Sequence, residues 1–269
     1  MMLIVSVASG KEKMFTASTP ANTVVRSFLG IALNDSVDFI RWKLVLQDHS
    51  YHLQCNYGIG KPNTNGFFDG GKKIELNGPF IKRGIYYQLQ YGKRSLTTVW
   101  LNENLLHIAD GNNKLLVGNG GWSYTLNSLS PVATDAFSLH ASPMLVKDSV
   151  RFAGRSGCKV PGIIEPGSQC YKLKWLIAIY ADPQKAASGT YKLYGTAYRK
   201  EGGKKGNWKI MRGRNGRIIY QLDDGNGKGL LYLLEASDGV LIFTDKMGNL
   251  LVGDEDFSYT LNKETNVRM

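Results

Sequence analysis

The sequence lacks the long apolar segments and the helical periodicity that would place it in several large classes of protein. No run of about 18 apolar residues occurs, so no transmembrane helix is predicted. No stretch repeats its apolar residues convincingly every 3.6 positions, which disfavours a mainly helical fold. A hydrophobic fraction of 43% with 31 glycines instead indicates a folded, turn-rich, all-β protein.

Catalytic groups are scarce as well. Histidine is the usual base beside a nucleophile, and the chain has four: His49, His52, His107 and His140. No G-x-S-x-G, H-E-x-x-H or phosphate-binding glycine motif is present. We therefore predict a protein that is not an enzyme, with no catalytic, cofactor-binding or metal-binding residues and no cofactor. An enzyme with an unrecognised site stays as an alternative.

Only three cysteines occur. Cys158 and Cys170 flank a Pro/Gly-rich loop, and a disulfide across it would contribute about 3 kcal/mol in the chain-entropy model. That pairing suits an oxidising compartment, whereas two unpaired thiols are the alternative. Cys55 is left over and is expected to be a buried, small apolar residue.

What the chain does contain is a long internal repeat. Residues 105–127 and 240–262 align without a gap at a shift of 135, with 11 of 23 positions identical. The shared positions include the LLVG and SYTLN blocks, and Asp110 and Asp245, which we expect to cap tight turns. The main difference is the replacement of residues 119–121 (NGG) by residues 254–256 (DED). A period this long means two tandem domains.

Short β-rich stretches separated by turn residues fill both copies. The first copy has predicted strands at residues 39–46, 51–57, 73–76, 84–91, 96–101, 105–109 and 122–126. The second has them at residues 171–180, 190–198, 206–211, 217–222, 230–234 and 240–244. Short antiparallel strands remove their edges by closing, so we predict two tandem small antiparallel lipocalin-like β-barrels. Shared aromatic positions are interpreted as core, with cavity walls as the alternative: Trp42/Trp175, Tyr87/Tyr220 and Trp122/Phe257.

The expected boundaries follow from this alignment. Residues 1–24 are an export-signal remnant or flexible lead-in, residues 25–127 the first barrel and residues 128–149 a linker. Residues 150–262 form the second barrel and residues 263–269 a tail. Aligning residues 28–30 (FLG) with residues 152–154 (FAG) predicts about nine extra residues in the second copy, which would hold the cysteine-bounded loop.

Two further patterns suggest binding. His49, His52 and Cys55 could offer ligands to copper or zinc, but residues three apart on a strand point to opposite faces. The net charge of +11 is concentrated in residues 192–217, where lysines, arginines and aromatics alternate. This segment could bind single-stranded nucleic acid or an anionic envelope polymer. We favour a hairpin with aromatics inside and basic residues in solvent.

The second copy also carries a family pattern. Its elements are FAGR at residues 152–155 with Cys158, CYKLKW at 170–175, YQL at 220–222 and LVG-x-x-x-FSYTLN at 251–262. In these residues it resembles an uncharacterised bacterial family related to the N-terminal domain of the copper-resistance lipoprotein NlpE, and the first copy resembles it more distantly. The resemblance implies a small lipocalin-like barrel in the cell envelope. The lipoprotein's C-x-x-C pair and lipid-attachment cysteine are absent, so no binding residue is carried over.

Together these observations predict a non-enzymatic, exported protein of the periplasm or cell exterior. It would bind an unknown small ligand or an envelope protein, in a setting of metal or envelope-stress homeostasis. A copper- or zinc-binding protein is the alternative, and nucleic acid is not the expected partner.

Overall fold

The computed structural model describes residues 12–139 and 149–264, apart from residues 166, 183, 197, 199–201 and 214–215. Residues 1–11 of the expected export-signal remnant or lead-in (residues 1–24) lie outside the described residues, as do residues 140–148 of the linker and residues 265–269 of the tail. No helix in the described part of the chain is long and apolar enough to cross a membrane.

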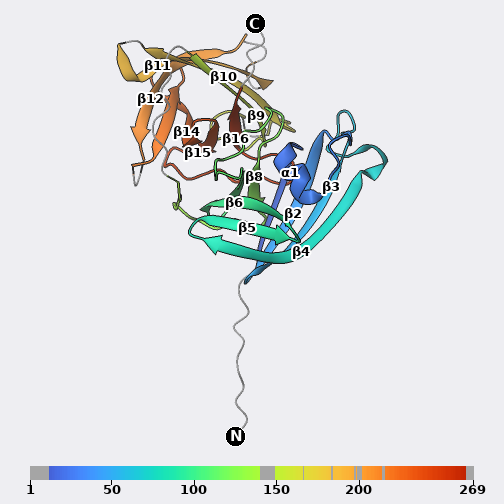
Figure 1. The fold of residues 1–269 in the computed structure, drawn as a ribbon. Helices are drawn as coiled ribbons and strands as arrows, with labels where there is room; N and C mark the ends of the chain where they lie inside the picture. Colours follow the sequence, from blue (N-terminus) through green and yellow to red (C-terminus); the bar gives the residue numbers. More distant parts are fainter. Residues whose placement is uncertain are drawn as a thin grey trace.

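Two closed eight-stranded antiparallel barrels lie in tandem, which confirms the predicted all-β class (Figure 1). The first consists of β1 (Lys13–Thr19), β2 (Phe39–Gln47), β3 (Ser50–Gly58), β4 (Lys72–Arg83), β5 (Tyr86–Tyr91), β6 (Arg94–Asn102), β7 (Leu105–Ala109) and β8 (Thr125–Ser128). The second consists of β9 (Ser149–Ser156), β10 (Leu173–Asp182), β11 (Lys185–Gly195), β12 (Lys204–Arg212), β13 (Ile218–Asp223), β14 (Gly229–Ser237), β15 (Val240–Thr244) and β16 (Thr260–Lys263). Pairing of β8 with β1 and of β16 with β9 closes the barrels.

The first barrel begins at Lys13, so the predicted boundary at residue 25 is wrong. Strand β1 lies inside the expected lead-in and pairs with β2, with Ala17 opposite Trp42. Its inward residue Phe15 is fully buried. The outward residues Thr16 and Ser18 are also buried, and the Ser18 hydroxyl donates to the carbonyl of Glu255 in the second barrel. The outward residues of β1 are polar although they are buried, and for this reason the sequence of the strand resembles that of a flexible segment.

The true equivalent of Phe152 is Phe15, because Gly154 lies opposite Trp175 as Ala17 lies opposite Trp42. Both tryptophans donate their indole N–H to a hydroxyl at the end of the neighbouring strand. Trp42 bonds Thr19 Oγ1 and Trp175 bonds Ser156 Oγ, each at 2.8 Å. The alignment of residues 28–30 with 152–154 is therefore wrong. The connection after β9 (residues 157–172) is in fact shorter than the one after β1 (residues 20–38).

These two connections cover the cores in different ways. The first contains α1 (Thr23–Leu29), a short helix that the sequence did not predict. Asn22 Oδ1 accepts from the Val25 N–H at its start, and Gly30 ends it at φ 73°. Its side chains Val25 and Phe28 are buried in the first core.

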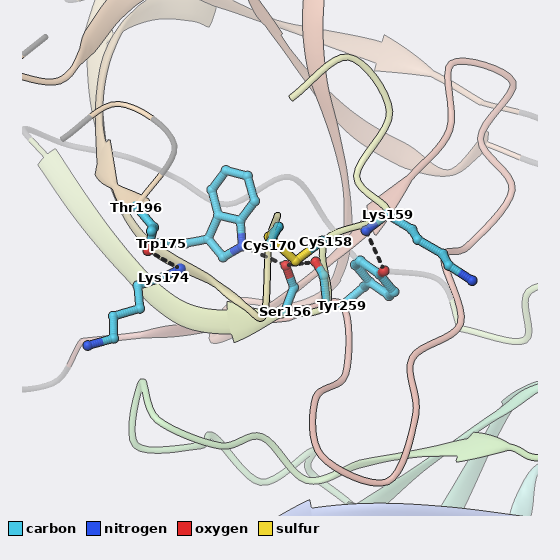
Figure 2. Close-up of a disulfide and its surroundings, with 9 residues drawn as sticks. Ser156, Cys158, Lys159, Cys170, Lys174, Trp175, Thr196 and Tyr259 are labelled. Atoms are coloured by element: carbon cyan, nitrogen blue, oxygen red, sulfur yellow. Dashed lines mark hydrogen bonds between the residues drawn. A yellow bond between two sulfur atoms is a disulfide. The ribbon is translucent and has the colours of Figure 1, made fainter. Parts of the chain in front are cut away.

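In the second barrel a disulfide loop takes this place. Cys158 and Cys170 are bonded, with their Cα atoms 6.0 Å apart. Val160 packs into the second core, and the Lys159 N–H donates to the Tyr259 hydroxyl (Figure 2). The loop is thereby fastened at its base and inside the barrel.

Large side chains occupy the barrel interiors. Phe15, Trp42 and Leu53 are at most 1% exposed in the first, as are Phe152 and Tyr220 in the second. The repeated residues Trp42, Trp175, Tyr87 and Tyr220 belong to these cores, as predicted. Trp122 differs: it is half-buried and stacks on Phe39 at 4.7 Å, while Arg155 of the second barrel lies over its ring.

A third apolar cluster joins the barrels. It combines outward residues of β6 and β7 with outward residues of β13 to β15. Its members are Val99, Leu101, Leu105, Ala109, Ile219, Leu234, Ala236, Val240, Ile242 and Leu250. Phe137 and Leu139 of the linker pack against this cluster, and the Ser138 N–H donates to Leu101 O. The linker is therefore docked on the interface.

At the centre of this interface each residue meets its own copy. Ser123 Oγ lies 2.6 Å from Ser258 Oγ, and Thr125 Oγ1 lies 2.9 Å from Thr260 Oγ1, both pairs separated by 135 residues. Asn262 and Asn127 accept a reciprocal pair of hydrogen bonds, each from a glycine of the other barrel. Gly118 N–H donates to Asn262 Oδ1, and Gly253 N–H donates to Asn127 Oδ1. This is the pattern of a self-complementary twofold interface. The serine, threonine and asparagine of each SYTLN block therefore serve contact between the barrels, while the tyrosine and leucine belong to the barrel cores.

The same interface explains why Gly118 and Gly253 are shared by the two copies. A Cβ on Gly118 would lie 2.2 Å from Trp122 O, and one on Gly253 would lie 2.1 Å from Phe257 O. Only glycine lets the backbone pass this closely while its N–H reaches the asparagine of the other barrel.

One buried histidine breaks the symmetry. His107 Nε2 lies 2.9 Å from the Leu116 carbonyl, which can only accept, so Nε2 carries the proton. In the neutral ring Nδ1 then accepts from Thr125 Oγ1 at 2.9 Å, and Thr125 accepts from Thr260. The equivalent residue in the second copy is the apolar Ile242. A single neutral imidazole thus fixes the direction of hydrogen bonds across the interface.

We predict an acid sensitivity from His107. Its complete burial lowers its pKa from 6.5 to about 4. Between pH 6.5 and about pH 4 the unfolded chain binds a proton at His107 that the folded chain excludes. The free energy of unfolding therefore falls as the pH drops. The loss is absent above pH 6.5 and reaches roughly 3 kcal/mol near pH 4. Urea unfolding at a series of pH values measures it. His107→Ile should remove this part of the slope, and an unchanged slope in that variant would contradict the assignment.

The disulfide should stabilise the second barrel. Replacing Cys158 and Cys170 together by serine is expected to lower the free energy of unfolding by about 3 kcal/mol, because the unfolded chain regains loop freedom. Urea titration followed by tryptophan fluorescence measures the change. Cys55→Ser, at a buried thiol outside the disulfide, is the control for a generic effect of the substitution. Equal stability of the double variant and the unaltered chain would show that the loop is held by packing alone.

Candidate functional site

The metal-ligand candidates do not converge. On β3 the Cys55 side chain points into the first core, whereas His52 points outward, where Nδ1 lies 2.6 Å from Asn77 Oδ1. No group of three or more metal-ligating side chains occurs in the described ranges of the chain. The strand geometry that separates these two side chains therefore argues against His49, His52 and Cys55 as a copper or zinc site.

The shared aspartates hold turns, as their positions indicated. Asp110 Oδ1 accepts the N–H groups of Asn112 and Lys114 at 2.8 and 2.9 Å. Asp245 Oδ1 accepts those of Met247 and Asn249 at the same distances. These carboxylates are occupied by backbone amides.

The acidic loop at residues 254–256 contacts the first barrel. Asp256 receives Arg41 Nη2 and Asn65 Nδ2, each at 2.5 Å, on its two carboxylate oxygens. The replacement of NGG by DED in the second copy thus strengthens contact between the barrels.

The basic segment forms a different kind of feature. Its described part is the hairpin of β11 and β12, in which Tyr191 and Trp208 point inward and are 1% and 3% exposed. Lys192, Lys205 and Lys209 point outward. Arg199, Lys200, Glu201 and Arg214 lie outside the described residues. The favoured interpretation, aromatics inside and basic residues in solvent, holds for these five residues, but it is wrong for Tyr194, which is 41% exposed, and for Arg217, which is 8% exposed.

The structure adds residues from a third strand to the outward side. Strand β10 contributes the exposed Lys174 and the half-buried Tyr180, and β11 contributes Tyr194, which is 41% exposed. We call the outer side of β10, β11 and β12 the lysine–tyrosine face. Its members are Lys174, Leu176, Tyr180, Thr190, Lys192, Tyr194, Lys205, Asn207 and Lys209.

Like charges sit side by side on this face. Lys192 and Lys205 are direct cross-strand partners, an arrangement that costs stability unless an anion intervenes. Among the described residues neither lysine forms an ion pair, and Lys192 Nζ lies 5.9 Å from the centre of the Tyr180 ring. The face therefore has cationic groups available to a ligand.

The nearby carboxylate of Asp223 does not neutralise them. It accepts the Asn207 N–H at 2.8 Å and the Gly225 N–H at 3.0 Å. Desolvation raises the pKa of Asp223, but these hydrogen bonds and the charge of Lys209 outweigh it and lower the pKa overall. The carboxylate stays ionised and engaged with backbone amides at the edge of the face.

Two shallow grooves run over the face. One of about 500 Å³ is lined by Lys174, Leu176, Tyr194, Thr196 and Tyr198. The other, about 530 Å³, is lined by Tyr180, Thr190, Lys192, Lys205 and Asn207. Gly206 also lines this second groove. A Cβ atom at this position would lie 2.5 Å from Asp223 Oδ1. The lysine–tyrosine face follows β10 from Lys174 to Tyr180, roughly 20 Å at about 3.3 Å per residue.

The first barrel provides an internal comparison. The register places His52 and Asn77 where the second barrel has Lys192 and Lys205. His52 and Asn77 are hydrogen-bonded, and His52 Nε2 also lies 3.5 Å from Glu75 Oε1, so the fold does not need two facing lysines at this position. The lysine pair is therefore a property of the second barrel that its architecture does not require.

Sequence reasoning located the basic residues but treated them as one segment. It missed Lys174 and Tyr180, which only strand register brings to the same face. Comparison of the chain with family models, curated proteins and solved structures finds no match in any of the three, so the resemblance to the NlpE-related family stays a prediction.

Proposed function

We propose that this chain is a non-enzymatic, exported binding protein that holds a linear acidic polysaccharide on the lysine–tyrosine face of its second barrel. The observation that carries the proposal is the cross-strand pair of Lys192 and Lys205, set among outward tyrosines and without an ion pair within the described part of the chain. The corresponding positions of the first barrel hold His52 and Asn77, which are hydrogen-bonded to each other.

The shape of the face favours a chain-like ligand. Two grooves follow one another along β10 and β11, and each contains lysine, tyrosine and a hydroxyl or amide side chain. Repeating acidic groups on a polymer could meet the lysines in turn. Tyrosine rings offer flat apolar surface to sugar rings, while Thr190 and Asn207 offer hydrogen bonds to hydroxyl groups.

Several features favour a polysaccharide over nucleic acid. The cations of the described face are lysines, which act as point charges, whereas arginine's planar fork is the side chain suited to bidentate phosphate recognition. The disulfide supports an oxidising compartment, where extracellular and envelope glycans occur.

A matched pair of double variants tests the proposal in the full chain. Lys192→Gln with Lys205→Gln should weaken binding of polygalacturonate roughly tenfold at low salt, since two exposed charge contacts are worth about 1.4 kcal/mol together. Lys43→Gln with Lys73→Gln removes the same charge from the first barrel, where both lysines are exposed, and should leave binding unchanged. Calorimetry with polygalacturonate, neutral dextran and single-stranded oligothymidylate measures these affinities.

Three outcomes would overturn the proposal. One is the absence of saturable binding to polygalacturonate. Another is an equal loss in both double variants, which would indicate attraction by net charge alone. Tighter binding of oligothymidylate than of polygalacturonate would instead assign the face to single-stranded nucleic acid.

A further inference from the structure

The first barrel has an open mouth at the end away from α1. It is a cavity of about 300 Å³ whose floor is formed by Leu46, Phe80, Tyr87 and Trp100. Three of these four side chains belong to the barrel core, and Trp100 is half-buried against it. Leu46, Phe80 and Tyr87 are 5%, 8% and 7% exposed, so Trp100 is the most accessible ring at the mouth, and Asp48 and Glu103 also line the cavity.

The aromatic floor is ordered. Tyr87 and Trp100 stack with their ring centres 5.3 Å apart and their planes 24° from parallel. Phe80 packs against Tyr87 with their ring centres 5.5 Å apart. An aromatic ligand entering this cavity would pack against aromatic side chains.

Two lysines stand at the rim. Lys13 pairs in register with the inward Leu46, and Lys82 with the inward Tyr87, so both project on the interior side of the sheet at its end. Lys82 Nζ lies 5.3 Å from the centre of the Tyr87 ring, and Lys13 Nζ 4.3 Å from that of Trp100. Lys13 also forms an ion pair with Glu103. Lys82 has no ion pair within the described part of the chain.

The second barrel shows that its fold does not require this arrangement. The register places Val150 at the position of Lys13 and Ile210 at that of Lys82. Glu235 replaces Trp100, and its carboxylate accepts the Tyr220 hydroxyl at 2.6 Å. The ring stack and both rim lysines are thus specific to the first barrel.

We propose that the mouth of the first barrel binds a small planar aromatic anion, a carboxylate or sulfonate, with its ring on the Tyr87–Trp100 floor and its acid group at Lys82. The cavity lies at the lower end of the size range of small-molecule sites, which limits the ligand to one or two fused rings. A mouth of this kind is a usual ligand position in barrels. The site is separate from the lysine–tyrosine face and does not depend on its function.

Calorimetry on the full chain with 1-naphthoate and its neutral counterpart 1-naphthamide tests this site. Lys82→Met removes the charge at an exposed position and should weaken naphthoate roughly threefold while leaving naphthamide unchanged. Lys93→Met removes an exposed lysine from the turn between β5 and β6 and is the matched control. Trp100→Leu should weaken both probes by at least tenfold.

Each result decides the matter. Failure of naphthoate to saturate the chain, or equal effects of Lys82→Met and Lys93→Met, would overturn the proposal. Should Trp100→Leu fail to fold by its thermal melt, the difference between the two lysine variants still decides it. Lys192→Gln with Lys205→Gln should leave naphthoate binding unchanged, and a loss there would place the probe on the other barrel.

Discussion

The interface between the barrels depends on one constraint: each copy must bind the other with the same residues. Ser123 meets Ser258 and Thr125 meets Thr260, while Asn127 and Asn262 exchange bonds with Gly253 and Gly118. In a twofold arrangement one substitution changes two contacts, so the sequences of both sides are restrained together. This explains why identity is concentrated at residues 105–127 and 240–262. A barrel needs inward apolar residues at these places, but it does not need serine, threonine and asparagine on its outer side.

The same constraint makes the copies informative where they differ. Two groups of differences lie on surfaces outside the interface. His52 and Asn77 become Lys192 and Lys205 on one outer face, and Lys82 and Trp100 become Ile210 and Glu235 at one barrel end. Because both barrels have the same topology, these replacements cannot be attributed to the demands of folding. Difference between copies is therefore a better guide to function here than identity.

Much of the fold could be predicted from the sequence, and the failures have physical causes. Periodicity and turn residues located most strands and the duplication. Strand β1 was missed because its outward Thr16 and Ser18 are buried by the other barrel, which no local pattern reveals. Strand β4 was predicted too short because Gly78 and Pro79 signal a turn. In the structure β4 continues through them, since Gly78 permits close approach to Gln90 O and Pro79 stands where pairing passes from β3 to β5.

The candidate sites were less accessible for a related reason. Residue type alone identified the lysines of β11 and β12, but the face also needs Lys174 and Tyr180, whose place follows from register. The mouth of the first barrel could not be predicted, because Lys13 lay in a segment without assigned structure. The interface then limits where binding can occur: it covers the outer sides of β6, β7 and β13 to β15. The outer side of β10 to β12 and the mouth of the first barrel lie outside that cluster. Because the barrels are joined through equivalent faces, the sequence differences at the two candidate sites lie on surfaces that the interface does not cover.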